Sequence, residues 1–134
     1  MAERALHAAL EGAQAEIAGP FELSLVFSND AGQQALNAHW RGKDASTNVL
    51  SFPQIEPFEP LEGLIGDIIL ARETVVKEAL EQGKSFNDHF SHLVVHGFLH
   101  ILGYDHLNDD EALEMEGLET QILSGLGISD PYAG

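Results

Sequence analysis

Residues 86–102 predict one long helix, whose last two turns carry regularly spaced histidines. The segment HGFLHILGYDH places His96, His100 and His106 at i, i+4 and i+10. Residues four apart are neighbours on a helix face, about 5–6 Å between Cβ atoms, so two imidazoles can reach one ion at about 2.0–2.1 Å. Gly103 can end the helix in a left-handed conformation and let the chain turn back with the third histidine. Three neutral imidazoles leave one coordination position open, which is typical of a catalytic zinc site.

The histidine spacing has two other interpretations. Histidines on a helix face and in a loop can simply be hydrogen-bonded or solvated, although a glycine and a third histidine in register disfavour this. Zinc peptidases share the spacing as HExxHxxGxxH, with a glutamate after the first histidine as general base. Gly97 stands at that position here, and no glutamate lies between His96 and His106. The sequence therefore disfavours a peptidase, and we expect that Gly97→Glu would crowd the open coordination position.

The remaining hydrophobic pattern predicts a small mixed sheet packed with about five helices, a sandwich-like arrangement of the α+β class. The length of 134 residues fits a single domain spanning 1–134. The expected strands are 22–27, 49–52 and 64–71, and the expected helices besides 86–102 are 6–17, the turn at 28–30 to about 40, 75 to about 83, and 108–126. Gly19-Pro20 is expected to stop the first helix, and Asn108 with Glu111 to begin the last one.

Composition excludes several classes of function. The absence of cysteine excludes disulfides, thiol catalysis and cysteine-ligated metals. Six basic against 22 acidic residues give a net charge of −16, so RNA binding would need a local cationic spot or a metal. No apolar run approaches the roughly 18 residues of a membrane span. The N-terminal segment is too acidic for a targeting signal, and we expect a cytoplasmic protein.

Several segments together closely resemble the bacterial YbeY family of metal-dependent endoribonucleases. They are the histidine motif, RGKDASTNVLSFP at 41–53, GDIILA at 66–71, DDEALEMEGLETQIL at 109–123 and DPY at 130–132. The resemblance covers residues 21–132. Family members usually begin with a strand before the first helix, whereas this chain starts at the helix. We therefore expect that strand to be absent, leaving a smaller sheet of about three strands with an exposed edge.

The resemblance implies a single-strand-specific endoribonuclease that processes ribosomal RNA, notably the 3′ end of the small-subunit RNA, and takes part in ribosome quality control. It implies one Zn²⁺ per chain on His96, His100 and His106. It also implies a small-subunit ribosomal protein and an Era-type GTPase as partners, besides RNA. A ribosome assembly factor with a mainly structural metal is the remaining alternative.

Further candidate residues lie upstream of the histidines. By resemblance Arg41 is the basic residue of the active cleft, where it binds the scissile phosphate and stabilises charge in the transition state. Lys43 is a substrate-binding candidate or an ordinary loop residue. Asn48 and Ser51 could position RNA, or could be a turn residue and a strand residue.

Two residues are candidates for an indirect role at the metal. Asp67 interrupts an apolar strand and could accept a hydrogen bond from a ligand histidine, or cap a neighbouring loop. His92 shares a face with His96 but is too far from His100 for all three to bind one ion, so it could support the ligands or pack against a helix. The other histidines, His7, His39 and His89, are expected at the surface.

Overall fold

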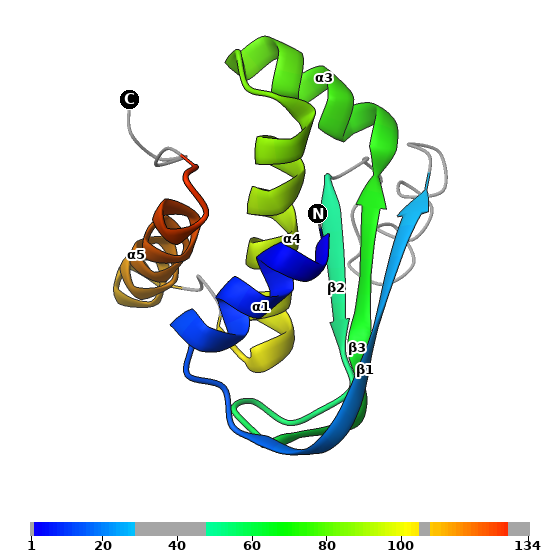
Figure 1. Ribbon diagram of the computed structural model, residues 1–134, viewed down its shortest axis with the longest axis vertical. Coiled ribbons are helices and arrows are strands. Elements are labelled where there is room, and N and C mark those ends of the chain that lie inside the picture. The colour runs from blue at the N-terminus through cyan, green and yellow to red at the C-terminus, as the bar shows by residue number, and fades with distance from the viewer. Residues whose placement is uncertain (1, 29–47, 105–107, 129–134) are drawn as a thin grey trace.

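The computed structural model describes residues 2–28, 48–104 and 108–128 (Figure 1). The elements are α1 (Ala2–Gly12), β1 (Ile17–Ser28), β2 (Val49–Pro53), β3 (Leu61–Ala71), α3 (Arg72–Gln82), α4 (Phe86–Leu102) and α5 (Asp109–Gly125). The three strands form one mixed sheet in the order β1-β3-β2, with β1 parallel and β2 antiparallel to β3. This is the small mixed sheet of the predicted α+β fold. The helix predicted between 28 and about 40 lies outside the described residues.

The first helix is shorter than its hydrophobic spacing predicts. It ends at Gly12, and the chain continues as β1 from Ile17, so Gly19 and Pro20 lie inside a strand. Ile17 pairs with Leu61 of β3, and the register shifts between Ile17 and Phe21. Proline cannot donate to a strand ladder, so an irregular register at this point is expected. Pairing with β3 thus overrides a local pattern that continues the helix.

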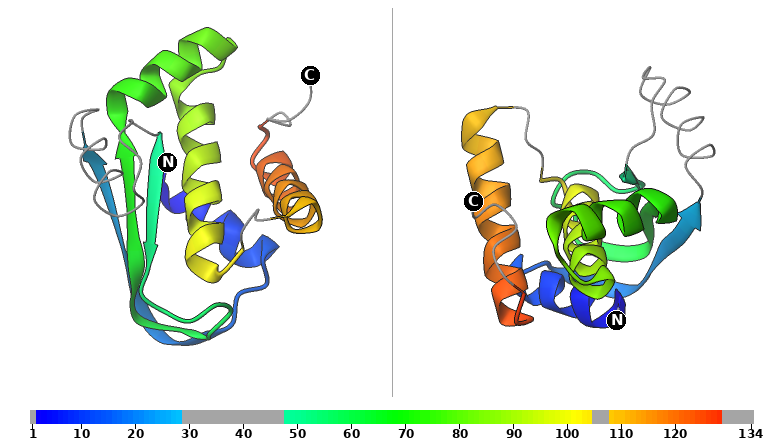
Figure 2. Two further views of the ribbon diagram at one scale, coloured as in Figure 1. Left: turned by 180° about the vertical axis from the view of Figure 1, so that it is seen from behind. Right: turned by 90° about the horizontal axis from the view of Figure 1, so that it is seen from above.

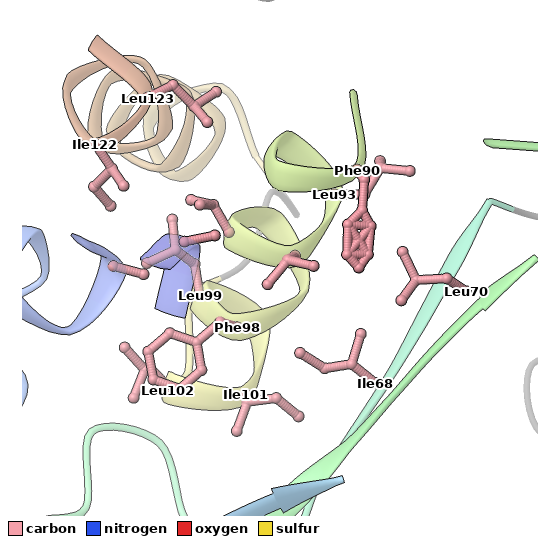
Figure 3. Packing of buried hydrophobic residues seen from close by; sticks show 14 of the residues in the cluster. Ile68, Leu70, Phe90, Leu93, Phe98, Leu99, Ile101, Leu102, Ile122 and Leu123 are labelled. Atoms are coloured by element: carbon pink, nitrogen blue, oxygen red, sulfur yellow. The ribbon is translucent and has the colours of Figure 1, made fainter. Parts of the chain in front are cut away.

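Helix α4 is the centre of the fold. It packs against β2 and β3 on one side, and α1, α3 and α5 all pack against it. Figure 2 shows α4 lying between the sheet and α5, with α3 across its N-terminal end. Figure 3 shows the apolar core that results from β3, α4 and α5, which includes Ile68, Leu70, Phe98, Leu99, Ile101, Ile122 and Leu123. One face of α4 therefore packs against the sheet, and another packs against α5.

Both ends of α4 lie where the sequence predicts them. The Ser85 side chain accepts a hydrogen bond from the Asp88 backbone N–H at 3.1 Å and caps the first turn. Gly103 ends the helix with a φ of 121°, and a Cβ there would lie 2.9 Å from Pro57. The Phe58 N–H donates to the Leu102 carbonyl at 2.7 Å. The loop after β2 thus holds the end of α4, and glycine is required by both backbone angle and space.

The helices on either side of α4 also begin or end at predicted caps. Gly83 ends α3 in the left-handed region with a φ of 66°. The Asn108 side chain accepts from the Glu111 N–H at 2.9 Å and begins α5. Met115 and Ile122 are buried on α5. Among the described helices, none is both long and apolar enough to cross a membrane.

Candidate metal centre

His96 and His100 bring their Nε2 atoms together on the C-terminal half of α4. The two nitrogens lie 3.2 Å apart, and the rings meet edge to face at 80°. Two nitrogens bound at about 2.0–2.1 Å to one tetrahedral ion lie about 3.3–3.4 Å apart. The observed spacing therefore suits a single divalent ion. The His96 side chain is 23% exposed, so solvent reaches the pair.

The third predicted ligand, His106, lies outside the described residues. Within residues 2–28, 48–104 and 108–128, no three side chains of the His, Cys, Asp or Glu type are placed to hold a metal ion. The structure thus brings two of the three predicted ligands together. Imidazole nitrogens are donors that zinc prefers, and the helix turn alone places these two at the required separation.

A carboxylate that the sequence analysis missed lies behind the histidine pair. Glu119 of α5 is fully buried, and its Oε1 forms a hydrogen bond with His96 Nδ1. The burial of Glu119 could have been predicted from the sequence. Glu119 lies four residues after Met115 and three before Ile122, so all three share one helix face, which is buried. A charged residue inside an apolar stripe is costly without a partner and therefore indicates one.

His92 lies on the other side of the same carboxylate. Its Nε2 is 3.4 Å from Glu119 Oε2, and its ring meets that of His96 nearly perpendicularly, with centroids 6.3 Å apart. This position fits the indirect role that the sequence left open for His92. Glu119 therefore contacts two imidazoles of α4, one through each oxygen.

A second histidine–carboxylate pair lies two turns earlier on α4. His89 Nε2 is 2.9 Å from Glu78 Oε1 of α3, and the Asn48 side chain donates to the same oxygen at 3.1 Å. The prediction that His89 is a surface residue was wrong, since only 3% of it is exposed. Glu78 makes this burial possible by pairing with the ring. His7 is exposed as predicted, and His39 lies outside the described residues.

Gly97 faces the sheet. A Cβ on Gly97 would lie 3.1 Å from both Ile68 Cγ2 and Ser51 Oγ. The Ser51 hydroxyl donates to the Gly97 carbonyl at 3.1 Å, so β2 and α4 are in close contact here. A side chain at position 97 would therefore start inside the contact between α4 and the sheet, where the structure leaves little room for it. The prediction that Gly97→Glu would crowd the coordination position stays a prediction.

The other predicted site residues are placed as follows. Asp67 of β3 accepts a hydrogen bond from the Gln54 side chain at 2.9 Å, and Glu119 takes the acceptor role at His96 that was considered for Asp67. The polar groups of Asn48 and Ser51 bind Glu78 and the Gly97 carbonyl, which fits their structural interpretation. Arg41 and Lys43 lie outside the described residues.

Tyr104 lies just after the end of α4, before the predicted third ligand. Its ring packs edge-on against Phe58, with centroids 5.0 Å apart. Burial raises the pKa of the Tyr104 phenol, and the nearby Glu114 carboxylate raises it further. The phenol therefore stays neutral, and its packing holds the chain where it leaves α4.

A comparison with models of protein families shows which family the chain belongs to. A model of the family described as Endoribonuclease YbeY matches residues 1–127. The chain belongs to the YbeY family. The matched range includes the histidine motif and the segment that carries Glu119.

Relatives in the YbeY family are similar over most of the chain. The Endoribonuclease YbeY of Agrobacterium fabrum is 55% identical over 141 positions, which cover 99% of this chain and 83% of that protein. That of Rhizobium leguminosarum bv. trifolii is 62% identical over 117 positions, covering 86% and 68%. The solution structure of TM1509 from Thermotoga maritima has a TM-score of 0.61 at 23% identity, covering 98% of this chain and 88% of that one. This structural likeness supports the α+β fold.

Proposed function

We propose that this YbeY family member is a single-strand-specific, metal-dependent endoribonuclease that processes ribosomal RNA, at the 3′ end of the small-subunit RNA, and acts in ribosome quality control. Family membership supports the cleavage of RNA. The observation that carries the metal dependence is the 3.2 Å approach of His96 Nε2 to His100 Nε2. Two imidazoles directed at one point of a partly exposed helix face suit a metal ligand pair.

The proposed cofactor is one Zn²⁺ per chain, held by His96, His100 and His106. Three neutral imidazoles leave the full charge on the ion and leave room for substrate. When bound, such an ion would act as a Lewis acid toward a phosphate oxygen and would lower the pKa of a bound water toward neutral pH. This chemistry suits a chain in which Gly97 occupies the place of a peptidase's glutamate base.

The net charge of −16 makes local positive charge essential for an enzyme acting on RNA. Arg41 is the proposed catalytic residue besides the ligands, since a guanidinium can clamp a phosphate with two parallel hydrogen bonds. Lys43, two residues on, adds to phosphate binding. The proposed partners are ribosomal RNA, a small-subunit ribosomal protein and an Era-type GTPase, and the proposed location is the bacterial cytoplasm.

The test is single-turnover cleavage of a ribosomal RNA fragment at saturating enzyme, which separates chemistry from binding. Arg41→Ala should keep its metal and slow cleavage by about 10²-fold or more, and Arg41→Lys should restore only part of the rate. His100→Ala, prepared identically, controls for contaminating nuclease. Casein incubated with the same metal-loaded protein should stay intact. Cleavage by His100→Ala at the wild-type rate, or cleavage of casein, would contradict the proposal.

A further inference from the structure

Glu119 is the buried carboxylate of the described structure. Within the described residues, the buried polar or charged side chains are His89, Ser91 and Glu119, and Glu119 is fully inaccessible to solvent. Moving a carboxylate out of water costs several kcal/mol unless charge and hydrogen bonds compensate. The other buried residues on its helix face, Met115, Ile122 and Leu123, are apolar. An apolar side chain would serve the packing of α5 equally well, so this carboxylate points to a role beyond packing.

Each oxygen of the Glu119 carboxylate lies against a histidine of α4. Oε1 binds His96 Nδ1, and Oε2 lies 3.4 Å from His92 Nε2. An ionised carboxylate only accepts hydrogen bonds, so its partner nitrogen on His96 carries the proton. A neutral imidazole has one N–H, so in this tautomer His96 Nε2 is the acceptor nitrogen, which is the form that binds metal. That nitrogen is the one that lies 3.2 Å from His100 Nε2.

We infer that Glu119 is a positioning residue of the proposed metal centre: it selects the His96 tautomer whose Nε2 binds metal and orients that ring, while His92 helps to hold the carboxylate. This inference rests on the proposed function. Carboxylates that accept from a ligand histidine raise its basicity and commonly contribute 10- to 100-fold in metal affinity. Glu119 also joins α5 to α4, the two helices that flank His106 in the sequence.

A matched pair of substitutions separates positioning from packing. Glu119→Gln and Glu78→Gln each remove one negative charge beside an α4 histidine. Zn²⁺ affinity is measured by competition with a chelator, and thermal unfolding of the metal-free proteins is measured in parallel. Glu119→Gln should lose about 10-fold in affinity, and Glu119→Leu, which cannot accept at all, about 100-fold. Glu78→Gln should bind Zn²⁺ like wild type.

Nitrogen NMR of the histidine rings provides a readout that needs no variant. In the metal-free wild-type protein, His96 should carry its proton on Nδ1. An Nε2-protonated His96 would overturn the inference, even if every Glu119 variant failed to fold. Wild-type affinity in folded Glu119→Leu would also overturn it. A wild-type protein that takes up no Zn²⁺ would instead overturn the proposed metal centre itself, so the two failures are distinguishable.

Discussion

Two carboxylates from flanking helices, Glu78 and Glu119, pair with histidines of α4, and the proposed metal centre lies beside only one of them, Glu119. His89 and His96 are seven residues apart, two turns along the helix and on nearly the same face. Each ring is paired with a carboxylate from a flanking helix, Glu78 of α3 or Glu119 of α5. The His89–Glu78 and His96–Glu119 pairs thus have the same residue types, and both histidines lie on α4. They differ in which ring nitrogen contacts the carboxylate.

The occupied nitrogen decides what each ring can do. Glu119 takes Nδ1 of His96, so Nε2 is directed at a second imidazole, His100. Glu78 takes Nε2 of His89 and also accepts from Asn48, while His89 Nδ1 is buried with no hydrogen-bond partner among the described residues. His89 on α4 therefore has a structural role: together with Asn48, just before β2, it binds Glu78 of α3. In the proposed metal centre, the nitrogen of His96 opposite the carboxylate meets the ring of His100, whereas no such partner is described for His89 Nδ1.

The largest expected effect tests the two histidines directly. His100→Ala should remove most of the bound metal, a loss of more than about 100-fold in affinity, because losing a ligand costs more than losing its supporting partner. His89→Gln should retain about one ion per chain. Elemental analysis of both purified variants measures this. Stoichiometric metal in His100→Ala, or its loss in His89→Gln, would reverse the roles assigned to the two pairs.

Substitutions of Gly97 test whether the face of α4 toward the sheet serves only packing. Gly97→Glu should destabilise the protein by about 3–5 kcal/mol, because it places an unpaired charge in the helix–sheet contact. Gly97→Ala, the matched control for space alone, should cost about 1–3 kcal/mol. Urea unfolding of the metal-free proteins measures both. If the wild-type protein cut no RNA with any metal and Gly97→Glu gained proteolytic activity, the peptidase interpretation would be favoured instead.

Glu78 tests the structural pair. Glu78→Leu leaves the polar groups of His89 and Asn48 without their acceptor, which costs about 1–3 kcal/mol, towards the lower end because the Glu78 side chain is 29% exposed. Zn²⁺ affinity should not change. The control is Glu81→Leu, which breaks an exposed 4.0 Å pair with Lys77 and should cost less than about 1 kcal/mol. Equal stabilities of the two variants would remove the structural role given to the His89 pair.

Ser51 gives the smallest expected effect. Ser51→Ala loses the hydrogen bond to the Gly97 carbonyl, worth about 0.5–1.5 kcal/mol of stability. The concentration of RNA that half-saturates single-turnover cleavage should be unchanged, because the hydroxyl is used inside the protein. Weaker RNA binding at unchanged stability would restore Ser51 as a substrate-binding residue and place RNA on the sheet side of α4.

The sequence by itself determined the parts of this protein that depend on neighbouring residues. The bounds of α4, its end at Gly103, and the approach of His96 to His100 follow from a helical repeat and one glycine. These features need no information from elsewhere in the chain, since a turn of helix brings i and i+4 together whatever surrounds it.

Only the tertiary structure decided what depends on residues distant in sequence. It ended α1 at Gly12 because the following residues pair with β3, and it buried His89 because α3 brings Glu78 to it. It also brought Glu119 to His96 across 23 residues of sequence. Helical spacing states which residues share a face, but which neighbour that face meets depends on how the helices pack. The contacts of His89 and His96 were therefore decided by the helices that pack against α4.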